Sequence, residues 1–157
     1  MNTDNELLIN KETDAYNLIR FLRAQDYESS GYNNALQEVT NGRKRKHWIW
    51  YIFPQIKGLG HSDYSEYYGI DSLEEAKAYL KHKILGERLR EISNALFQLD
   101  GKTAVEIFGY TDAMKVKSCM TLFDIVSPHD IFKRVLEKYY DGQRCKLTLK
   151  RFNINSI

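Results

Sequence analysis

The sequence feature that most constrains the fold is a series of helix-start signals from residue 72 onward. Ser72 and Thr103 each stand three positions before a glutamate, the pattern of a capping box in which hydroxyl and carboxylate satisfy the first amides of a helix. Residues 127–130 combine a capping serine with a proline suited to a first helical turn. Apolar residues follow these signals at spacings of three and four, so the chain is predicted to be mainly α-helical.

We expect about seven helices in one compact domain, with at most a minor strand component. They cover residues 13–27, 32–39, 72–83, 85–99, 103–108 and 131–140, and one more begins at residue 111 or 112. The glycines expected to end helices are Gly42, Gly101, Gly109 and Gly142. Residues 47–53 are apolar nearly throughout and fit either a buried strand or a buried helical turn. The stretch after Pro54 contains three glycines and is predicted to be a loop.

Length and composition fit a single domain over residues 1–157, in which residues 1–12 are expected to be flexible and residues 143–157 receive no assignment. The net charge of +2 is too small for a general nucleic-acid binder. Cys119 and Cys145 lack the spacing of a zinc site or a disulfide framework, so we expect reduced thiols, no metal and no cofactor. The sequence shows neither a signal peptide nor a run of about 18 apolar residues, which indicates a cytoplasmic protein without membrane association. The oligomeric state stays open.

The most informative stretch for function is the basic–aromatic block, residues 43–55, in which four consecutive cations run into a histidine and two tryptophans. This mixture suits a ligand with phosphates and a flat ring, because cations bind phosphate and aromatic faces stack on rings. The candidates are Arg43 and Lys44 for phosphate, Trp48 or Trp50 for stacking, and Gln55 or His47 for hydrogen bonding or proton transfer. The alternative is a solvated basic turn followed by a core segment in which both tryptophans only pack.

Two other segments carry candidate polar contacts. The loop at residues 58–63 contains Ser62, and its glycines would let backbone amides approach an anion, although any tight turn has the same composition. On the helix that begins near Asp112, Lys115 and Ser118 lie three positions apart and would line one edge. Helix capping and a solvated lysine explain this second pattern equally well.

The residues of these segments resemble those of a bacterial family of small single-domain proteins, domain of unknown function 1810. The resemblance covers about residues 16–142 and rests on Phe21-Leu22, Ala24-Gln25, Gly42-Arg43-Lys44, His47-Trp48, Trp50, Ile52-Phe53-Pro54-Gln55, Gly58-Leu59-Gly60, Ser62, Tyr68, Ile70, Tyr79-Leu80, Ile107-Phe108-Gly109, Asp112, Lys115, Ser118 and Met120-Thr121-Leu122-Phe123. The chain departs from the family pattern at Lys83, where a proline is usual, and at Cys119, where a serine is usual. A fainter similarity around residues 79–89 links it to the NADAR group, which acts on ADP-ribose derivatives.

The leading hypothesis is binding of a phosphorylated nucleotide of the NAD or ADP-ribose type, with or without hydrolysis of an N-glycosidic bond. The expected ligand contacts are Arg43, Lys44, Trp48 or Trp50, Gln55, Ser62, Tyr68, Lys115 and Ser118. If a reaction occurs, His47 is the candidate proton carrier and Asp112 the carboxylate that would stabilise an oxocarbenium-like state. Two other classes stay open: a module for single-stranded nucleic acid, and a protein-interaction domain with exposed aromatic residues.

Overall fold

A computed structural model describes residues 14–27 and 29–154, and these residues form ten α-helices and no β-strand. The helices are α2 (Ile19–Gln25), α3 (Tyr32–Thr40), α4 (Ile49–Ile52), α5 (Asp63–Tyr67), α6 (Leu73–Lys81), α7 (Lys83–Gln98), α8 (Ala104–Phe108), α9 (Tyr110–Val126), α10 (Ile131–Tyr140) and α11 (Lys146–Arg151). The prediction of a mainly helical single domain is confirmed, with more helices than the expected seven. The stretch predicted to be flexible, residues 1–12, lies outside the described residues.

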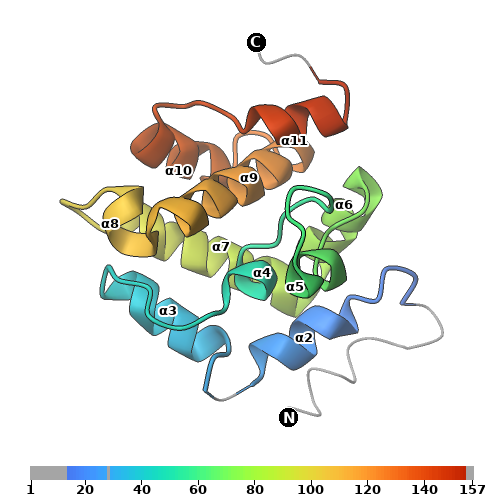
Figure 1. Cartoon of the computed structure of the whole chain (residues 1–157), viewed down its shortest axis with the longest axis horizontal. Helices are drawn as coiled ribbons and strands as arrows, with labels where there is room; N and C mark the ends of the chain where they lie inside the picture. Colours follow the sequence, from blue (N-terminus) through green and yellow to red (C-terminus); the bar gives the residue numbers. More distant parts are fainter. Residues whose placement is uncertain (1–13, 28, 155–157) are drawn as a thin grey trace.

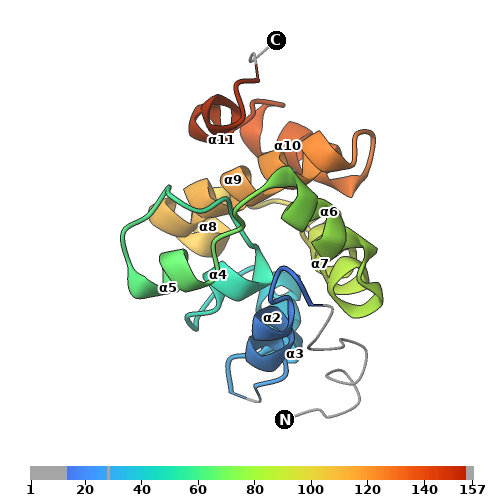
Figure 2. The ribbon, with the colours of Figure 1, turned by 90° about the vertical axis from the view of Figure 1, so that its right-hand side faces the viewer.

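Helices α7 and α9 form the centre of the fold. Figures 1 and 2 show α10 and α11 on one side of them and α2 and α3 on the opposite side. Val116, Met120 and Phe123 face inward from α9 and are fully buried. The ring of Phe123 packs against Tyr79 of α6 and Phe132 of α10, with centroid separations of 5.5 and 5.7 Å. The long helix α9 is therefore fixed by the core, and its first turns carry Asp112 and Lys115.

The predicted helix-start signals hold to different degrees. Thr103 forms the complete capping box with Glu106 at the start of α8. The Ser72 hydroxyl accepts from the amide of Glu75, but the carboxylate of Glu75 accepts from the amide of Asp71 rather than from that of Ser72. The box at α6 is thus half formed, and the carboxylate of Glu75 is left for another partner. All four glycines predicted to end helices have φ between +75° and +79°.

The boundary between α6 and α7 differs from the prediction, which extended the earlier helix to residue 83. The helix ends at Lys81 because His82 caps the next helix, its Nδ1 atom accepting from the amides of Ile84 and Leu85 at 3.2 Å each. Gly86 allows the resulting close contact, since a Cβ atom there would lie 2.1 Å from the carbonyl oxygen of Leu80. Histidine is not among the usual capping residues, so the sequence contains no familiar capping signal for the boundary between α6 and α7.

Helix α10 has the predicted bounds, residues 131–140, but its capping residue is not the predicted Ser127. Asp130 caps the helix, with its Oδ1 atom accepting from the amide of Ile131 at 2.7 Å. The hydroxyl of Ser127 donates to Oδ2 of the same carboxylate at 2.7 Å. The serine therefore supports the cap instead of forming it.

Three short helices go beyond the prediction. The apolar run that fitted a strand or a helix contains the helical turn α4, and the strand-like pairing is a single parallel bridge between Ile56 and Ile70. The stretch predicted to be a loop contains α5, which Ser62 caps by accepting from the amide of Ser65. The tail left without assignment contains α11. Helices α4 and α5 lie close together in both views and form the side of the molecule that carries the candidate site.

Candidate functional site

The basic turn between α3 and α4 is shaped by one buried acid, Glu38. Its Oε1 atom accepts from the amides of Arg45 and Lys46, at 2.6 and 3.0 Å, and from the indole nitrogen of Trp48, at 3.0 Å. Burial would raise the pKa of Glu38, but these hydrogen bonds outweigh it and the pKa is lowered. Glu38 thus holds the cation-rich turn in one shape and fixes Trp48, which is fully buried in the core.

The turn sends its cations in two directions. Arg43, Arg45 and Lys46 are exposed, and so is His47. Lys44 instead points inward, where its Nζ atom lies 2.8 Å from Oδ2 of Asp112 and 5.1 Å from the ring centre of Trp48. One of the four consecutive cations therefore reaches the start of α9, and three face solvent.

Asp112 joins this lysine to a second one. Its Oδ1 atom lies 3.3 Å from Nζ of Lys115, one turn further along α9. The same Lys115 ammonium lies 4.8 Å from the ring centre of Trp50, within the range of a cation–π interaction. Lys44, Asp112, Lys115 and Trp50 therefore form a continuous row with a formal net charge of +1.

The aromatic half of the site comes from α4 and α5. The ring of Tyr64 stacks on Trp50 with a centroid separation of 4.9 Å and an interplanar angle of 18°. Tyr64 is also nearly parallel to Tyr68, at 6.5 Å and 7°. The basic row thus ends at a set of rings that lies over α5.

A small cavity of about 70 Å³ opens beside these groups and is lined by Trp50, Gln55, Ile56, Leu59, Gly60, Ser65, Tyr68, Gly69 and Lys115. The side-chain amide of Gln55 and the hydroxyl of Tyr68 make no hydrogen bond with any residue that the structure describes. Burial, followed by the neighbouring tyrosines, raises the pKa of Tyr68 to about 12. Its hydroxyl therefore stays protonated at neutral pH, and both groups are free to bind a ligand.

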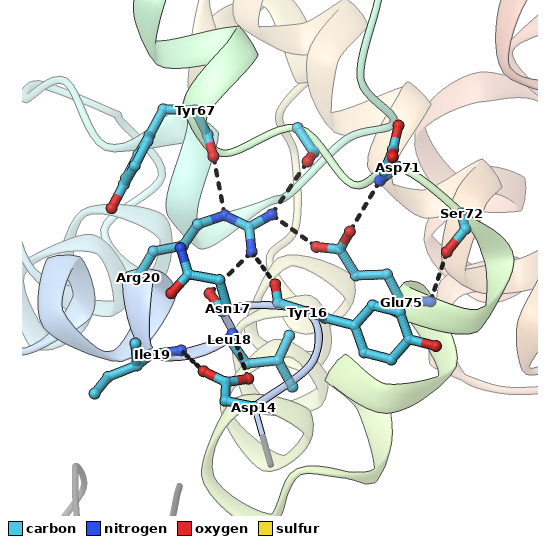
Figure 3. Close-up of polar contacts among 11 residues, drawn as sticks. Asp14, Tyr16, Asn17, Leu18, Ile19, Arg20, Tyr67, Asp71, Ser72 and Glu75 are labelled. Carbon is cyan, nitrogen blue, oxygen red and sulfur yellow. Dashed lines mark hydrogen bonds and ion pairs between the residues drawn. The ribbon is translucent and has the colours of Figure 1, made fainter. Parts of the chain in front are cut away.

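A buried arginine positions one wall of this cavity (Figure 3). The guanidinium of Arg20 donates to the carbonyl oxygens of Tyr67 and Gly69, at 2.9 and 3.1 Å, and to Oε2 of Glu75, at 2.7 Å. It also donates to the carbonyl oxygens of Tyr16 and Asn17. Arg20 thus ties the end of α5, and the glycine that follows it, to α2 and α6.

The sequence matches the family described as "Protein of unknown function (DUF1810)" over residues 15–152. The chain belongs to this family. It is also similar to the conserved hypothetical protein Rv1873 from Mycobacterium tuberculosis, with 41% sequence identity and a TM-score of 0.85 over 90% of this chain and all of that one. A search of curated proteins finds no match.

The structure brings together six of the residues singled out from the sequence of this DUF1810 protein: Lys44, Trp50, Gln55, Tyr68, Asp112 and Lys115. Of these six, Trp50, Gln55, Tyr68 and Lys115 line the cavity, and Lys44 and Asp112 are joined to it through Lys115. The remaining candidates do not line it. Arg43 and His47 face solvent, Trp48 belongs to the core, and Ser62 caps α5. The hydroxyl of Ser118 makes hydrogen bonds to the carbonyl oxygen of Met114 and to Sγ of Cys145.

Tyr64 belongs to this site but is not among the residues predicted from the sequence. Its four-residue spacing from Tyr68 would have placed both rings on one face of a helix, but the glycines around residues 58–69 indicated a loop instead. A five-residue helix gives too short a pattern for periodicity to reveal.

A wider groove of about 930 Å³ lies elsewhere, between α9, α10 and the start of α11. Its charged lining residues are Lys117, Asp124, Lys133, Glu137, Asp141, Arg144 and Lys146. Cations and acids nearly balance there, and Arg144 is already paired with Asp124 at 2.5 Å. The functional argument therefore rests on the smaller cavity, where polar groups without partners meet an aromatic wall.

Two further features bear on the class of protein. Within the described residues, no helix is both long and apolar enough to cross a bilayer. In the same part of the chain, no three side chains of His, Cys, Asp or Glu come together as metal ligands would.

Proposed function

We propose that this protein binds a phosphorylated nucleotide of the NAD or ADP-ribose type at the cavity that Trp50 and Lys115 line. The observation that carries the proposal is the combination at one place of a cation, an aromatic face and two polar groups without partners. Lys115 lies over the Trp50 ring at 4.8 Å, and Gln55 and Tyr68 line the same cavity. Phosphate, ring and ribose hydroxyls are the three parts of a nucleotide that such groups recognise.

The size of the cavity limits which part of the ligand it encloses. Its volume of about 70 Å³ lies well below the roughly 300–1,000 Å³ of sites that enclose a whole small molecule. The cavity would therefore hold a single group, such as a phosphate, against Lys115 and the hydroxyl of Tyr68. The rest of the nucleotide would lie against the ring of Trp50 on α4.

Asp112 has a supporting role in this proposal. Both of its carboxylate oxygens lie near ammonium groups, Oδ2 near Lys44 and Oδ1 near Lys115. The carboxylate thereby holds Lys115 in place over Trp50, and the cluster keeps a positive charge that favours an anion. The proposal covers binding alone, because His47, the candidate proton carrier, faces solvent and does not line the cavity.

A thermal-shift panel of NAD, ADP-ribose, ADP and a short single-stranded oligonucleotide tests the proposal. A nucleotide at a hundred times its Kd should stabilise the protein by about 2.7 kcal/mol, which is a shift of roughly 5–10 °C for a domain of this size. Lys115→Ala should remove most of the shift. Lys117→Ala, on the same helix but lining the other groove, should keep it, as should His47→Ala.

Two results would contradict the proposal. One is the absence of any shift with all three nucleotides. The other is a shift with the oligonucleotide alone, with a log–log salt slope of roughly −2.8 if four phosphates are neutralised. That slope would instead indicate single-stranded nucleic-acid binding by the exposed cations of the basic turn.

A further inference from the structure

The ring that would stack on a nucleobase is already covered in this structure. Tyr64 lies against Trp50 with the centroid separation and small tilt of a stacked aromatic pair. A ligand ring cannot take that place while Tyr64 occupies it, because two ring centres 4.9 Å apart leave no room for a third ring between them. Access to this face of Trp50 therefore requires Tyr64 to move.

The attachment of α5 makes such a movement possible. None of the five residues of α5 is buried, and Tyr64 itself is 57% exposed. At its end, α5 is tied to Arg20 through the carbonyl oxygens of Tyr67 and Gly69. At its start, its cap is internal, between Ser62 and Ser65, and residues 58–61 make no hydrogen bond with the rest of the described structure. One end of the helix is therefore fixed and the other is free to turn away.

We propose that Tyr64 occupies the position of the ligand's ring, and that α5 turns about its Arg20-bound end to let a flat aromatic ring replace Tyr64 on Trp50. This inference rests on the proposed nucleotide site and adds the residue that controls access to it. The ligand class follows from what remains when Tyr64 leaves: an aromatic face 4.8 Å from an ammonium, beside the amide of Gln55. The site would thus select a planar ring that carries an anionic group.

Substitution of Tyr64 tests this inference through ligand binding. Tyr64→Ala removes the competing ring, so it should tighten ADP binding about 2- to 13-fold, the factor that corresponds to the worth of one aromatic pair. Pyrophosphate has no ring, and its affinity should be the same in both proteins. Tyr67→Ala is the matched control, because Tyr67 is as exposed as Tyr64 and on the same helix but contacts Tyr68 rather than Trp50. An unchanged or weaker affinity of the Tyr64→Ala variant for ADP would overturn the inference.

Hydrogen exchange without any ligand tests the covering of Trp50 separately. In the Tyr64→Ala variant, the amides of Ser65, Glu66 and Tyr68 should exchange faster, because α5 has lost its contact with Trp50, while the amides of α9 should not change. Equal exchange in both proteins would show that the stack does not hold α5 down, which overturns the inference. If exchange accelerates but neither protein binds ADP, the nucleotide proposal fails and the covering of Trp50 by Tyr64 stands.

Discussion

The ammonium of Lys44 lies 2.8 Å from a carboxylate oxygen of Asp112, with side chains that are only 8% and 18% exposed. This pair joins the basic turn to the first turns of α9, two segments far apart in the sequence. It also sets the charge of the candidate site, because the same carboxylate reaches Lys115. A pair this well shielded differs from an exposed surface pair, whose median worth is about 0–1 kcal/mol.

Asp112→Asn is expected to lower the free energy of unfolding by about 1–3 kcal/mol. The substitution leaves the nearly buried ammonium of Lys44 without its counter-ion, and breaking a fully buried pair costs about 3–5 kcal/mol. Urea unfolding at neutral pH measures the change. Asp100→Asn is the control, because Asp100 is 98% exposed where it pairs with Lys138, and it should change stability by less than about 0.5 kcal/mol. If both variants lost the same free energy of unfolding, burial of the Lys44–Asp112 pair would not explain its contribution to stability.

Glu38→Gln is expected to reduce stability at pH 7 by about 1–3 kcal/mol, since charge-assisted hydrogen bonds from four donors are weakened. The pKa of Glu38 is lower in the folded protein than its ordinary value of 4.5. Its contribution is therefore complete above about pH 4.5 and is lost as the pH falls through the lower folded value. The difference in free energy of unfolding between the original protein and the variant should therefore be smaller at pH 3 than at pH 7. The exposed substitution Glu137→Gln should open no such gap at either pH.

Arg20→Lys is expected to cost at least about 2 kcal/mol although it keeps the positive charge. An ammonium has three donors on one atom and cannot reach the five acceptors that the planar guanidinium binds in different directions. Buried carbonyl groups left without donors each cost about 1–3 kcal/mol. Denaturant unfolding provides the measurement, with Arg90→Lys as the comparison, since Arg90 is 42% exposed where it pairs with Asp130. A loss no larger than that of Arg90→Lys would refute this account of Arg20.

Gly86→Ala is expected to destabilise the protein by about 2 kcal/mol or more, because the new methyl group would overlap the Leu80 carbonyl at 2.1 Å. The start of α7 would have to move away from the end of α6. Gly101→Ala meets no atom within 4 Å but has φ of +77°, so its cost should be only about 1–2 kcal/mol from backbone strain. Thermal unfolding of the two variants separates steric overlap from strain, and equal losses would argue against the close approach.

Much of the fold follows from local signals in the sequence. Thr103 and Glu106 predict the start of α8 because both halves of the box are local and nothing else competes for them. Glu75 behaves differently, since the buried Arg20 from α2 takes one of its oxygens. That contact depends on tertiary structure, which no local pattern contains. Helix α5 could not be predicted for the same reason. It is too short to show apolar periodicity, and its contacts with Trp50 and Arg20 are tertiary.

The sequence predicts which types of residue form the candidate site better than it predicts which individual side chains point into it. The basic–aromatic block did point to Lys44 and Trp50, but the sequence gives no means of knowing which of four cations turns inward. The direction of each cation depends on Glu38 of α3, whose carboxylate accepts hydrogen bonds from two backbone amides of the turn. Trp48 and Trp50 are likewise indistinguishable by composition, and only packing separates the fully buried ring of Trp48 from the partly exposed ring of Trp50.

The guanidinium of Arg20 has a consequence for how the cavity would be studied. It holds the backbone at Tyr67 and Gly69 although its own side chain does not line the cavity. A genetic screen for loss of ligand recognition would therefore recover changes in α2 alongside those at Lys115. Unfolding measurements would be needed to separate the two groups, because only the α2 variants would recover recognition when the fold is strengthened by an unrelated substitution.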